Sequence, residues 1–387
     1  MHRLVYIAYM LMVASTGVTF VFLEDIETAY GLPAWGIGLI SSLSFITAIF
    51  AALVVAPFGD RGHLELLGAI AFVAAIAGNL WIGFADDLWS LSISRGLTGT
   101  GAGVFSVVGR KSLIGASTKD SAEKVGGFLS AAVAGFIAGP GIGAQLAEFG
   151  GIETPYIVLA ALMIIVSFPT LRWLRTVEIA TSKEITSRAM LPLLKRPGVR
   201  AALAAHVAVF FNIGVFDATI DEYLTDLGLS NTQVGMTLIV IGAPLLFLPR
   251  IAGRRLDRTE QPATIMLIAL AVFVPVVLAV GLWVGAMVFL ALGLIQTSME
   301  SVLFPSATRV LLNETDANQS AIATGLLEAG GSAAGAISAF IAPIMYDLTD
   351  GPSGPFGMSG VVALTLLIVS WMNVQRIDYG RSVMATA

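Results

Sequence analysis

Residues 262–282 read PATIMLIALAVFVPVVLAVGL, an apolar run without one charged side chain. A helix needs about 20 such residues to cross the ~30 Å hydrocarbon core of a bilayer. Runs of this length recur from Leu4 to Gln375, and they predict an all-α integral membrane protein with twelve transmembrane helices. The expected spans are residues 4–24, 36–57, 64–84, 88–110, 124–147, 154–174, 199–220, 232–252, 262–282, 285–309, 320–345 and 356–376.

The composition excludes several classes of protein. Hydrophobic residues make up 56% of the 387 residues and charged residues 12%, which rules out a soluble domain. The chain contains no cysteine, so it can form neither disulfides nor thiolate metal sites. It also lacks the phosphate-binding motif G-x-x-x-x-G-K-[ST], so transport driven directly by ATP is not expected. We expect no enzymatic activity, no catalytic residue, no metal site and no cofactor.

The loops on the two sides of the expected spans differ in charge. Starting from a cytoplasmic N-terminus, the spans place twenty of the 21 lysines and arginines on one side. The loops on the other side hold acidic residues only, including Asp25, Asp86, Glu148, Asp221 and Asp350. Because cationic loops resist translocation, both termini are predicted to lie in the cytoplasm, as in a multi-pass protein of the inner (plasma) membrane. Arg95 is the exception, because it lies inside an expected span.

The chain contains an internal repeat. The polar segment 175–198 is predicted to be a cytoplasmic linker between an N-terminal six-helix bundle, 1–174, and a C-terminal one, 199–387. A shift of 197 residues aligns the two halves at equivalent places. The matches are Glu24-Asp25 with Asp221-Glu222, Gly31-Leu32 with Gly228-Leu229, Gly38 with Gly235, and Asp60-Arg61 with Asp257-Arg258. Parallel six-helix repeats of this kind are the architecture of one class of secondary transporters.

Two short loops share an Asp-Arg pair. The sequence after the second span reads APFGDRGH at 56–63, and that after the eighth reads GRRLDR at 253–258. Both resemble the G-x-x-x-D-R loop of the major facilitator superfamily, although Ala56 replaces the leading glycine and both copies lack the usual trailing basic residues. In that superfamily the carboxylate, here Asp60, joins the two halves by binding a helix N-terminus, here near Ser320. The alternative is a pair of tight turns.

These loops therefore supply candidates for a role in the conformational change. The residues in the loops are Asp60, Arg61, Asp257 and Arg258, and Arg110, at the end of the fourth span, is a further candidate.

The fourth span reads RGLTGTGAG at 95–103. An arginine inside hydrocarbon costs at least ~2.5–3.5 kcal/mol unless it is paired or hydrated, so Arg95 should face a polar interior. Arg95 with Gly99 and Gly101 resembles the R-x-x-x-G-x-G motif of the superfamily, which implies that the arginine supports substrate binding or proton coupling. A structural ion pair between helices is the alternative.

The fifth span contains GFIAGPGIG at 135–143. Glycines four apart allow helix backbones to approach closely, and Pro140 removes a backbone hydrogen bond and kinks the helix. The string Gly135, Gly139, Pro140 and Gly143 resembles the G-x-x-x-G-P-x-x-G motif of superfamily exporters, the drug/proton antiporter branch, with Ala144 in place of the usual final glycine. This resemblance implies export.

Taken together, these motifs make the chain similar to the twelve-helix exporters of the major facilitator superfamily. The resemblance implies a monomer that moves small lipophilic or amphipathic compounds out of the cell in exchange for protons, by alternating access, without a nucleic-acid partner. Export or symport of a specific endogenous solute, such as a sugar, amino acid, siderophore or lysolipid, is the alternative.

Proton coupling needs a carboxylate that is alternately buried and hydrated, so that its pKa moves between states. Acids inside spans are the candidates. We place Glu328 first, because the small residues 329–335 that follow it require a close neighbouring helix or a cavity. Glu300, well inside its span, comes next. Asp217 and Glu24 follow; both lie near outer ends and could instead be wetted by the outer loops.

Overall fold

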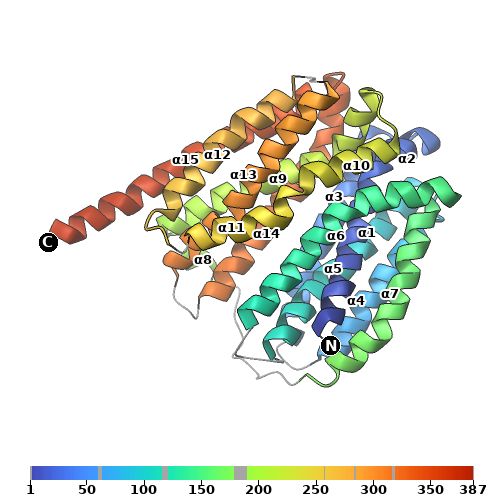
Figure 1. The fold of residues 1–387 in the computed structure, drawn as a ribbon, viewed down its shortest axis with the longest axis horizontal. Coiled ribbons are helices and arrows are strands. Elements are labelled where there is room, and N and C mark those ends of the chain that lie inside the picture. The colour runs from blue at the N-terminus through green and yellow to red at the C-terminus, as the bar shows by residue number, and fades with distance from the viewer. Residues whose placement is uncertain are drawn as a thin grey trace. The chain divides into compact units, whose positions relative to one another are not determined.

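The computed structural model describes residues 2–59, 63–115, 121–177, 190–256, 258–282, 285–315 and 319–386. These residues are helical almost throughout and contain no strand (Figure 1). Three residues singled out in the sequence, Asp60, Arg61 and Asp257, lie outside the described residues. The contacts between residues divide the chain into two compact units, one of Met1–Glu184 with Ile220–Val240, the other of Ile185–Thr219 with Ile241–Ala387.

In the described part of the chain, the first unit contains seven α-helices and one 3-10 turn. It also includes the end of α9 and most of α10. Its elements are α1 (His2–Val18), η1 (Thr19–Val21), α2 (Leu23–Tyr30), α3 (Ala34–Gly59), α4 (Leu64–Ile82), α5 (Leu88–Gly115), α6 (Ser121–Gly150) and α7 (Glu153–Leu174). Helix α5 packs between α3 and α4, while α1 packs against α6.

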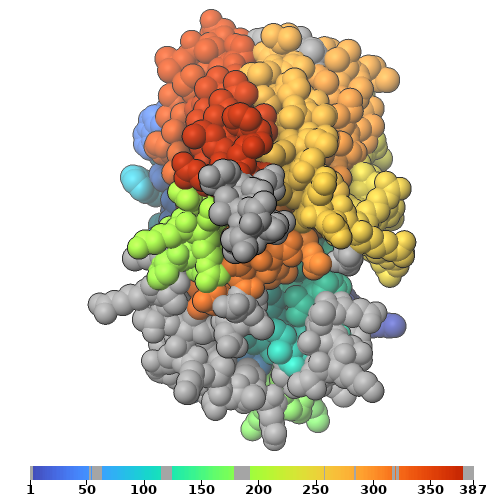
Figure 2. Space-filling model, turned by 90° about the vertical axis from the view of Figure 1, so that its left-hand side faces the viewer, coloured from blue at the N-terminus to red at the C-terminus, as the bar shows by residue number. Residues whose placement is uncertain are grey.

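The second unit contains the remaining helices. They are α8 (Met190–Leu193), most of α9 (Pro197–Asp226), the end of α10 (Asn231–Gly242), α11 (Pro244–Leu256), α12 (Pro262–Val280), α13 (Ala286–Asn313), α14 (Ser320–Leu348) and α15 (Ser353–Thr386). Helix α12 packs against α13 and α15, and α11 packs against α13. Figure 2 shows α12 and α15 side by side on the surface of this unit.

The helices agree in part with the predicted spans. A helical segment covers each of the twelve expected positions, and eleven segments of the described chain are long and apolar enough to cross a bilayer. The remaining helix is α5, whose 28 residues include Arg95, Arg110 and a series of glycines and serines. It is long enough to span, but it falls short of the apolar composition of the others.

The first span ends earlier than its hydropathy predicts. Helix α1 stops at Val18, a 3-10 turn follows, and Glu24 and Asp25 form the first turn of the separate helix α2. The expectation that these two acids end the first span is therefore wrong. An apolar run shows where a chain can enter a membrane, but it does not reveal a local change of hydrogen-bonding pattern within the run.

Two further boundaries differ from the prediction. The expected helix 232–252 is divided into α10 and α11 at Ala243, because Pro244 has no N–H and pushes the preceding residue out of helical geometry. Helix α9 continues to Asp226, six residues beyond the predicted end at 220. Asp221 is consequently a buried helical residue with 2% exposure, and its assignment to an outer loop is wrong.

The repeat is visible in backbone geometry. Gly31 and Gly228 both have positive φ values, 59° and 83°, a conformation that glycine adopts without steric cost. The N–H of Leu32 donates to Glu27 O, and the N–H of Leu229 donates to Leu224 O. Both pairs are related by the shift of 197 residues, so the two halves end this helix in the same way.

Glycines set the closest helix contacts in the first unit. A Cβ atom added at Gly99 or Gly103 would collide with the backbone of α3, and one added at Gly101 would collide with α4. The glycines of α5 therefore face two neighbouring helices in turn. In a bilayer, the hydrophobic effect does not drive helices together. Small residues allow close van der Waals packing, which stabilises the contact between helices instead.

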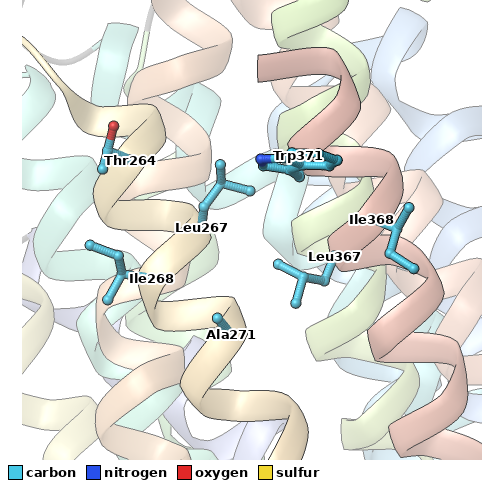
Figure 3. A pocket seen from close by; sticks show the side chains of 7 residues that line it. All are labelled: Thr264, Leu267, Ile268, Ala271, Leu367, Ile368 and Trp371. Atoms are coloured by element: carbon cyan, nitrogen blue, oxygen red, sulfur yellow. The ribbon is translucent and has the colours of Figure 1, made fainter. Parts of the chain in front are cut away.

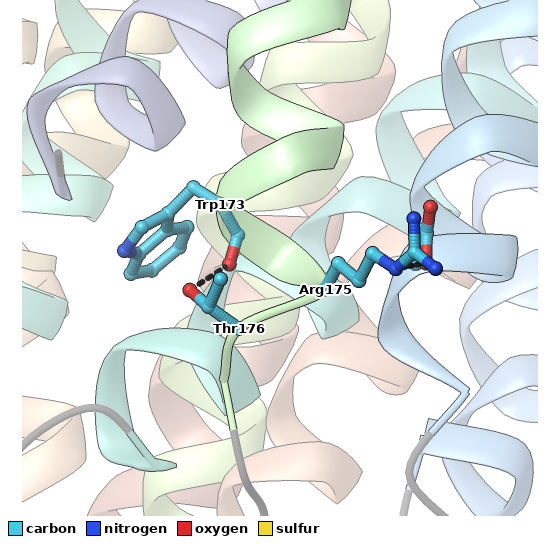
Figure 4. Close-up of polar contacts among 4 residues, drawn as sticks. Trp173, Arg175 and Thr176 are labelled. Carbon is cyan, nitrogen blue, oxygen red and sulfur yellow. Dashed lines mark hydrogen bonds and ion pairs between the residues drawn. The ribbon is translucent and has the colours of Figure 1, made fainter.

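The end of α7 carries a surface ion pair. Arg175 Nε lies 3.8 Å from a carboxylate oxygen of Glu65 in the first turn of α4, and the hydroxyl of Thr176 donates to Trp173 O at 2.7 Å (Figure 4). Both charged side chains are exposed, so the pair adds at most about 1 kcal/mol to stability.

We predict opposite effects of one substitution at two helical glycines. A Cβ at Gly139 would lie 2.5 Å from Ala14 O, so Gly139→Ala should force α6 away from α1 and destabilise the protein by about 1–3 kcal/mol. Gly325 in α14 has nothing within 4 Å of its Cβ position, so Gly325→Ala should be neutral or stabilising by up to about 1 kcal/mol. The thermal unfolding midpoints in detergent test this. Equal shifts for the two variants would contradict the proposed helix contact.

Candidate functional site

Arg95 is buried in the first unit, with 1% exposure. Its Nη1 donates to Thr16 O at 2.9 Å and to Thr19 Oγ1 at 3.1 Å. The guanidinium carbon lies 5.9 Å from the centre of the Phe20 ring, close enough for a cation–π contact. Arg95 therefore contacts the segment in which α1 gives way to the 3-10 turn.

The break in α1 explains how this site arises. In an unbroken α-helix, Thr16 O would accept from the N–H four residues later. Where the helix changes to 3-10 geometry, carbonyls and hydroxyls become available to other donors, and Arg95 uses one of each. Tyr156 on α7 adds to the network, because its hydroxyl donates to Thr19 Oγ1 at 3.3 Å.

The exporter-like string of α6 lies along α1. A Cβ at Gly135 would collide with Met10 O, and one at Gly143 would lie 2.9 Å from Val18 Cγ1. On the α1 side, a Cβ added at Gly17 would lie 2.8 Å from Phe136 O. The glycines four apart thus form one surface for α1, and that surface ends where α1 ends.

The opposite face of the same string contacts α10. A Cβ at Gly141 would collide with Ile239, and Gly235 lies against Pro140 O and Gly141. Gly235 is one of the residues matched in the internal repeat. The string in α6 therefore supports close packing on two sides.

Two other motif residues are described, and both have modest contacts. Arg110 Nε donates to Ser106 O on its own helix at 3.3 Å. Arg258 is exposed, and its N–H closes a turn by donating to Arg255 O at 3.1 Å.

Glu300 on α13 is only 3% exposed. Among the four predicted coupling acids, only Asp217 is more deeply buried. Gln296, one turn earlier, donates from Nε2 to Glu300 Oε1 at 3.1 Å. The next turn carries Phe304, which packs against His206 and Phe210 of α9 with ring centres 5.7 and 6.0 Å away. Glu300 therefore lies one turn before a member of an aromatic cluster.

His206 is buried within this cluster. Among the described residues, neither ring nitrogen has a hydrogen-bond partner. Its imidazole packs on Phe210 with centres 4.7 Å apart and lies against Gly331 of α14.

Glu328 and Asp217 differ in burial. Glu328 on α14 is half-buried, whereas Asp217 on α9 has 1% exposure. The small residues after Glu328 pack against α9, because Gly330 meets Leu203 and Gly335 O meets Gly214. The run therefore reflects a close neighbouring helix. Among the described residues, Glu328 has no hydrogen-bond or ion-pair partner.

The sequence named Glu24 as a candidate but did not bring it together with Asp25 and Asp221. Asp221 Oδ2 accepts the backbone N–H of Glu24 at 3.0 Å, at the N-terminus of α2. Asn231 donates from Nδ2 to Asp25 Oδ2. We call Glu24, Asp25 and Asp221 the α2–α9 carboxylate cluster. Glu24 and Asp221 contact each other and are related by the shift of 197 residues. The repeat alignment is therefore the sequence signal that could have paired them.

Electrostatics favour a bound proton on Glu24. Burial raises the pKa of Glu24 above its ordinary value; a hydrogen bond from Thr225 opposes this rise, and the charges of Asp25 and Asp226 add to it. A helix N-terminus stabilises a carboxylate by about 0.3–1 kcal/mol, or up to ~2 kcal/mol when partly buried. Burying a charge costs several kcal/mol, so the helix end offsets only part of that cost.

The apolar groove between α12 and α15 has a different character. Its volume is about 400 Å³, and its lining is Thr264, Leu267, Ile268, Ala271, Leu367, Ile368 and Trp371 (Figure 3). None of these residues is charged, so the groove offers no group for proton or ion coupling.

Comparisons with known proteins agree with this architecture. The family model "Major Facilitator Superfamily" matches residues 5–217 and again 202–383. The chain is 25% identical to multidrug resistance protein MdtG of Proteus mirabilis (strain HI4320) over 87% of its own length and 85% of that protein. It is 24% identical to MdtG of Klebsiella pneumoniae (strain 342) over 61% and 59%.

Solved structures share the fold. A D-xylose–proton symporter gives a TM-score of 0.72 at 16% identity, with 96% of each chain covered. A bacterial homologue of the human lysosomal transporter Spinster, in an inward-facing and occupied conformation, gives 0.72 at 12% identity, with 97% of this chain and 96% of that chain covered. The two family matches, one to each half, and the helices that place Arg95 and the α6 string show that this multi-pass membrane chain belongs to the Major Facilitator Superfamily and is a transporter, not an enzyme.

Proposed function

We propose that this transporter exports small lipophilic or amphipathic compounds across the inner membrane in exchange for protons, by alternating access. The observation that carries the proposal is the α6 string, whose glycines at 135, 139 and 143 pack along α1 while Gly141 packs on α10. The same string resembles the exporter motif of the superfamily. The relatives named multidrug resistance protein support the same direction of transport.

A proton-coupled cycle needs carboxyl groups that exchange burial for hydration. Glu300, Glu328, Asp217 and Glu24 remain the proposed coupling acids. In the structure Glu300 is far more enclosed than Glu328, so in this conformation Glu300 experiences the stronger desolvation. This difference supports testing Glu300 beside Glu328, which the sequence placed first.

The surroundings of Glu300 support a lipophilic substrate. Phe304 follows Glu300 by one turn on α13, and it packs with Phe210 and His206 of α9. Aromatic faces bind flat apolar groups and attract cations, and a carboxylate adds attraction for a cation. Transport of a specific endogenous solute is the second candidate, and it is separated by the assay below.

We expect everted membrane vesicles that contain the protein to show substrate-dependent loss of a preformed pH gradient. Lipophilic and amphipathic compounds should collapse part of the gradient, whereas D-xylose and amino acids should not. A pH-sensitive dye reports the gradient, and vesicles without the protein are the control. A response to a sugar or an amino acid alone would favour the second candidate.

Arg95→Ala should abolish transport while the protein still inserts and accumulates. Loss of the guanidinium removes the hydrogen bonds to Thr16 O and Thr19 Oγ1 that join α5 to the α1 break. Arg95→Lys keeps the charge but not the forked donor geometry, so it should retain only part of the activity. Efflux and membrane abundance are measured together. Parental efflux by Arg95→Ala would show that this network serves folding only.

Glu328→Gln and Glu300→Gln test the coupling acids. Glutamine keeps size and hydrogen bonding but does not titrate, so the coupling residue should lose gradient-driven accumulation while substrate binding persists. Accumulation in vesicles and binding to detergent-purified protein are measured for each variant. Glu65→Gln, at the exposed ion pair, is the control. Parental accumulation by both variants would exclude both residues as the essential proton carrier.

A further inference from the structure

Asp221 is a buried acid that makes a contact across a long stretch of sequence. Asp221 lies on α9 and is 2% exposed. Its Oδ2 accepts a hydrogen bond from the Glu24 N–H, and the N–H of Leu23 also interacts with the carboxyl group. Its second oxygen, Oδ1, is buried and accepts no hydrogen bond of normal geometry among the described residues. A buried polar atom left without a partner requires an explanation.

The groups around Asp221 are mainly acidic. Helix α2 contributes Glu24 and Asp25, both of which act on Asp221 electrostatically. The neutral amide of Asn231 on α10 bonds Asp25, and Asp226 on α9 acts on Glu24. The phenol of Tyr156 on α7 is a further neighbour, and the guanidinium of Arg95 on α5 lies beyond it. Tyr156 lies within electrostatic range of both Arg95 and Asp221, while Arg95 donates to Thr16 and Thr19.

We infer that Asp221 binds a proton when the end of α9 docks on α2, so that the α2–α9 carboxylate cluster is a latch closed by protonation. The inference deepens the proposed proton-coupled function by naming a proton site that the sequence did not identify. A proton on Oδ1 neutralises the carboxyl group at the oxygen that has no hydrogen-bond donor among the described residues, and Oδ2 continues to accept the Glu24 N–H.

The same proton removes one of three neighbouring negative charges. When α9 leaves α2, water reaches Asp221 and the proton passes to water. The docked state therefore holds more protons than the undocked state, and linkage requires that docking becomes stronger as pH falls. For one proton, the ratio of docked to undocked molecules changes by at most about tenfold per pH unit.

An ionised Asp221 that only caps α2 makes the opposite prediction. A carboxylate binds a helix N-terminus through its charge, so such a cap would tighten as pH rises. It would also weaken on substitution by asparagine, which carries no charge. The direction of the pH effect therefore separates a proton-closed latch from a structural cap.

The test is a distance measurement between α2 and α10. The chain has no native cysteine, so spin labels can be attached specifically to Ala29→Cys on α2 and Gln233→Cys on α10, both exposed positions. The full-length protein in lipid nanodiscs is studied between pH 5 and pH 8, without substrate and without a gradient. The parent should show a short-distance population that grows as pH falls.

Substitutions assign the effect to Asp221. Asp221→Asn copies the protonated carboxyl group, so its short-distance population should be large at every pH. Asp221→Ala lacks the acceptor, so its population should be small at every pH. Asp86→Asn makes the same chemical change at an exposed acid in a loop and should leave the parental pH response intact.

Three results would overturn the inference: no pH dependence in the parent, a short-distance population that grows with rising pH, or an Asp221→Asn variant that resembles Asp221→Ala. Because the measurement needs no transport, its failure is distinct from failure of the proposed function. If vesicles show no proton-coupled efflux while the distances respond as expected, the latch stands and the proposed coupling falls.

Discussion

Hydrocarbon provides no hydrogen-bond partners, and this constraint governs every polar group inside the protein. The backbone satisfies it by forming helices. Side chains satisfy it through partners inside the protein: Arg95 donates to a carbonyl and a hydroxyl at the α1 break, and Glu300 accepts from Gln296 on its own helix. Polar side chains therefore mark the places where helices must be correctly arranged, and the same places are where movement would change their surroundings.

Glycine makes those arrangements possible. The glycines of α5 contact α3 and α4, those of α6 contact α1 and α10, and Gly335 of α14 contacts Gly214 of α9. At Gly99, Gly103, Gly135, Gly139 and Gly214, a backbone carbonyl of the neighbouring helix lies where any side chain would collide. Since lipid is as apolar as leucine, close packing of this kind takes the place of hydrophobic burial as the force between helices.

The repeat has a structural consequence beyond duplicated architecture. Glu24 and Asp221 occupy equivalent positions in the two halves, and they contact each other through a helix N-terminus. This contact brings two corresponding acids of the repeat together, and it is the contact to which we assign a dependence on protons.

The sequence by itself determined the membrane class, the positions of the spans, the repeat and the burial of Arg95, because hydropathy and charge act over about 20 residues whatever the neighbours are. Only the tertiary structure decided that α1 breaks at Val18, that Asp221 is buried against α2, and that Glu300 is more enclosed than Glu328. These features depend on which face of a helix meets which neighbour. That choice arises from contacts between residues up to about 200 positions apart, which no local pattern encodes.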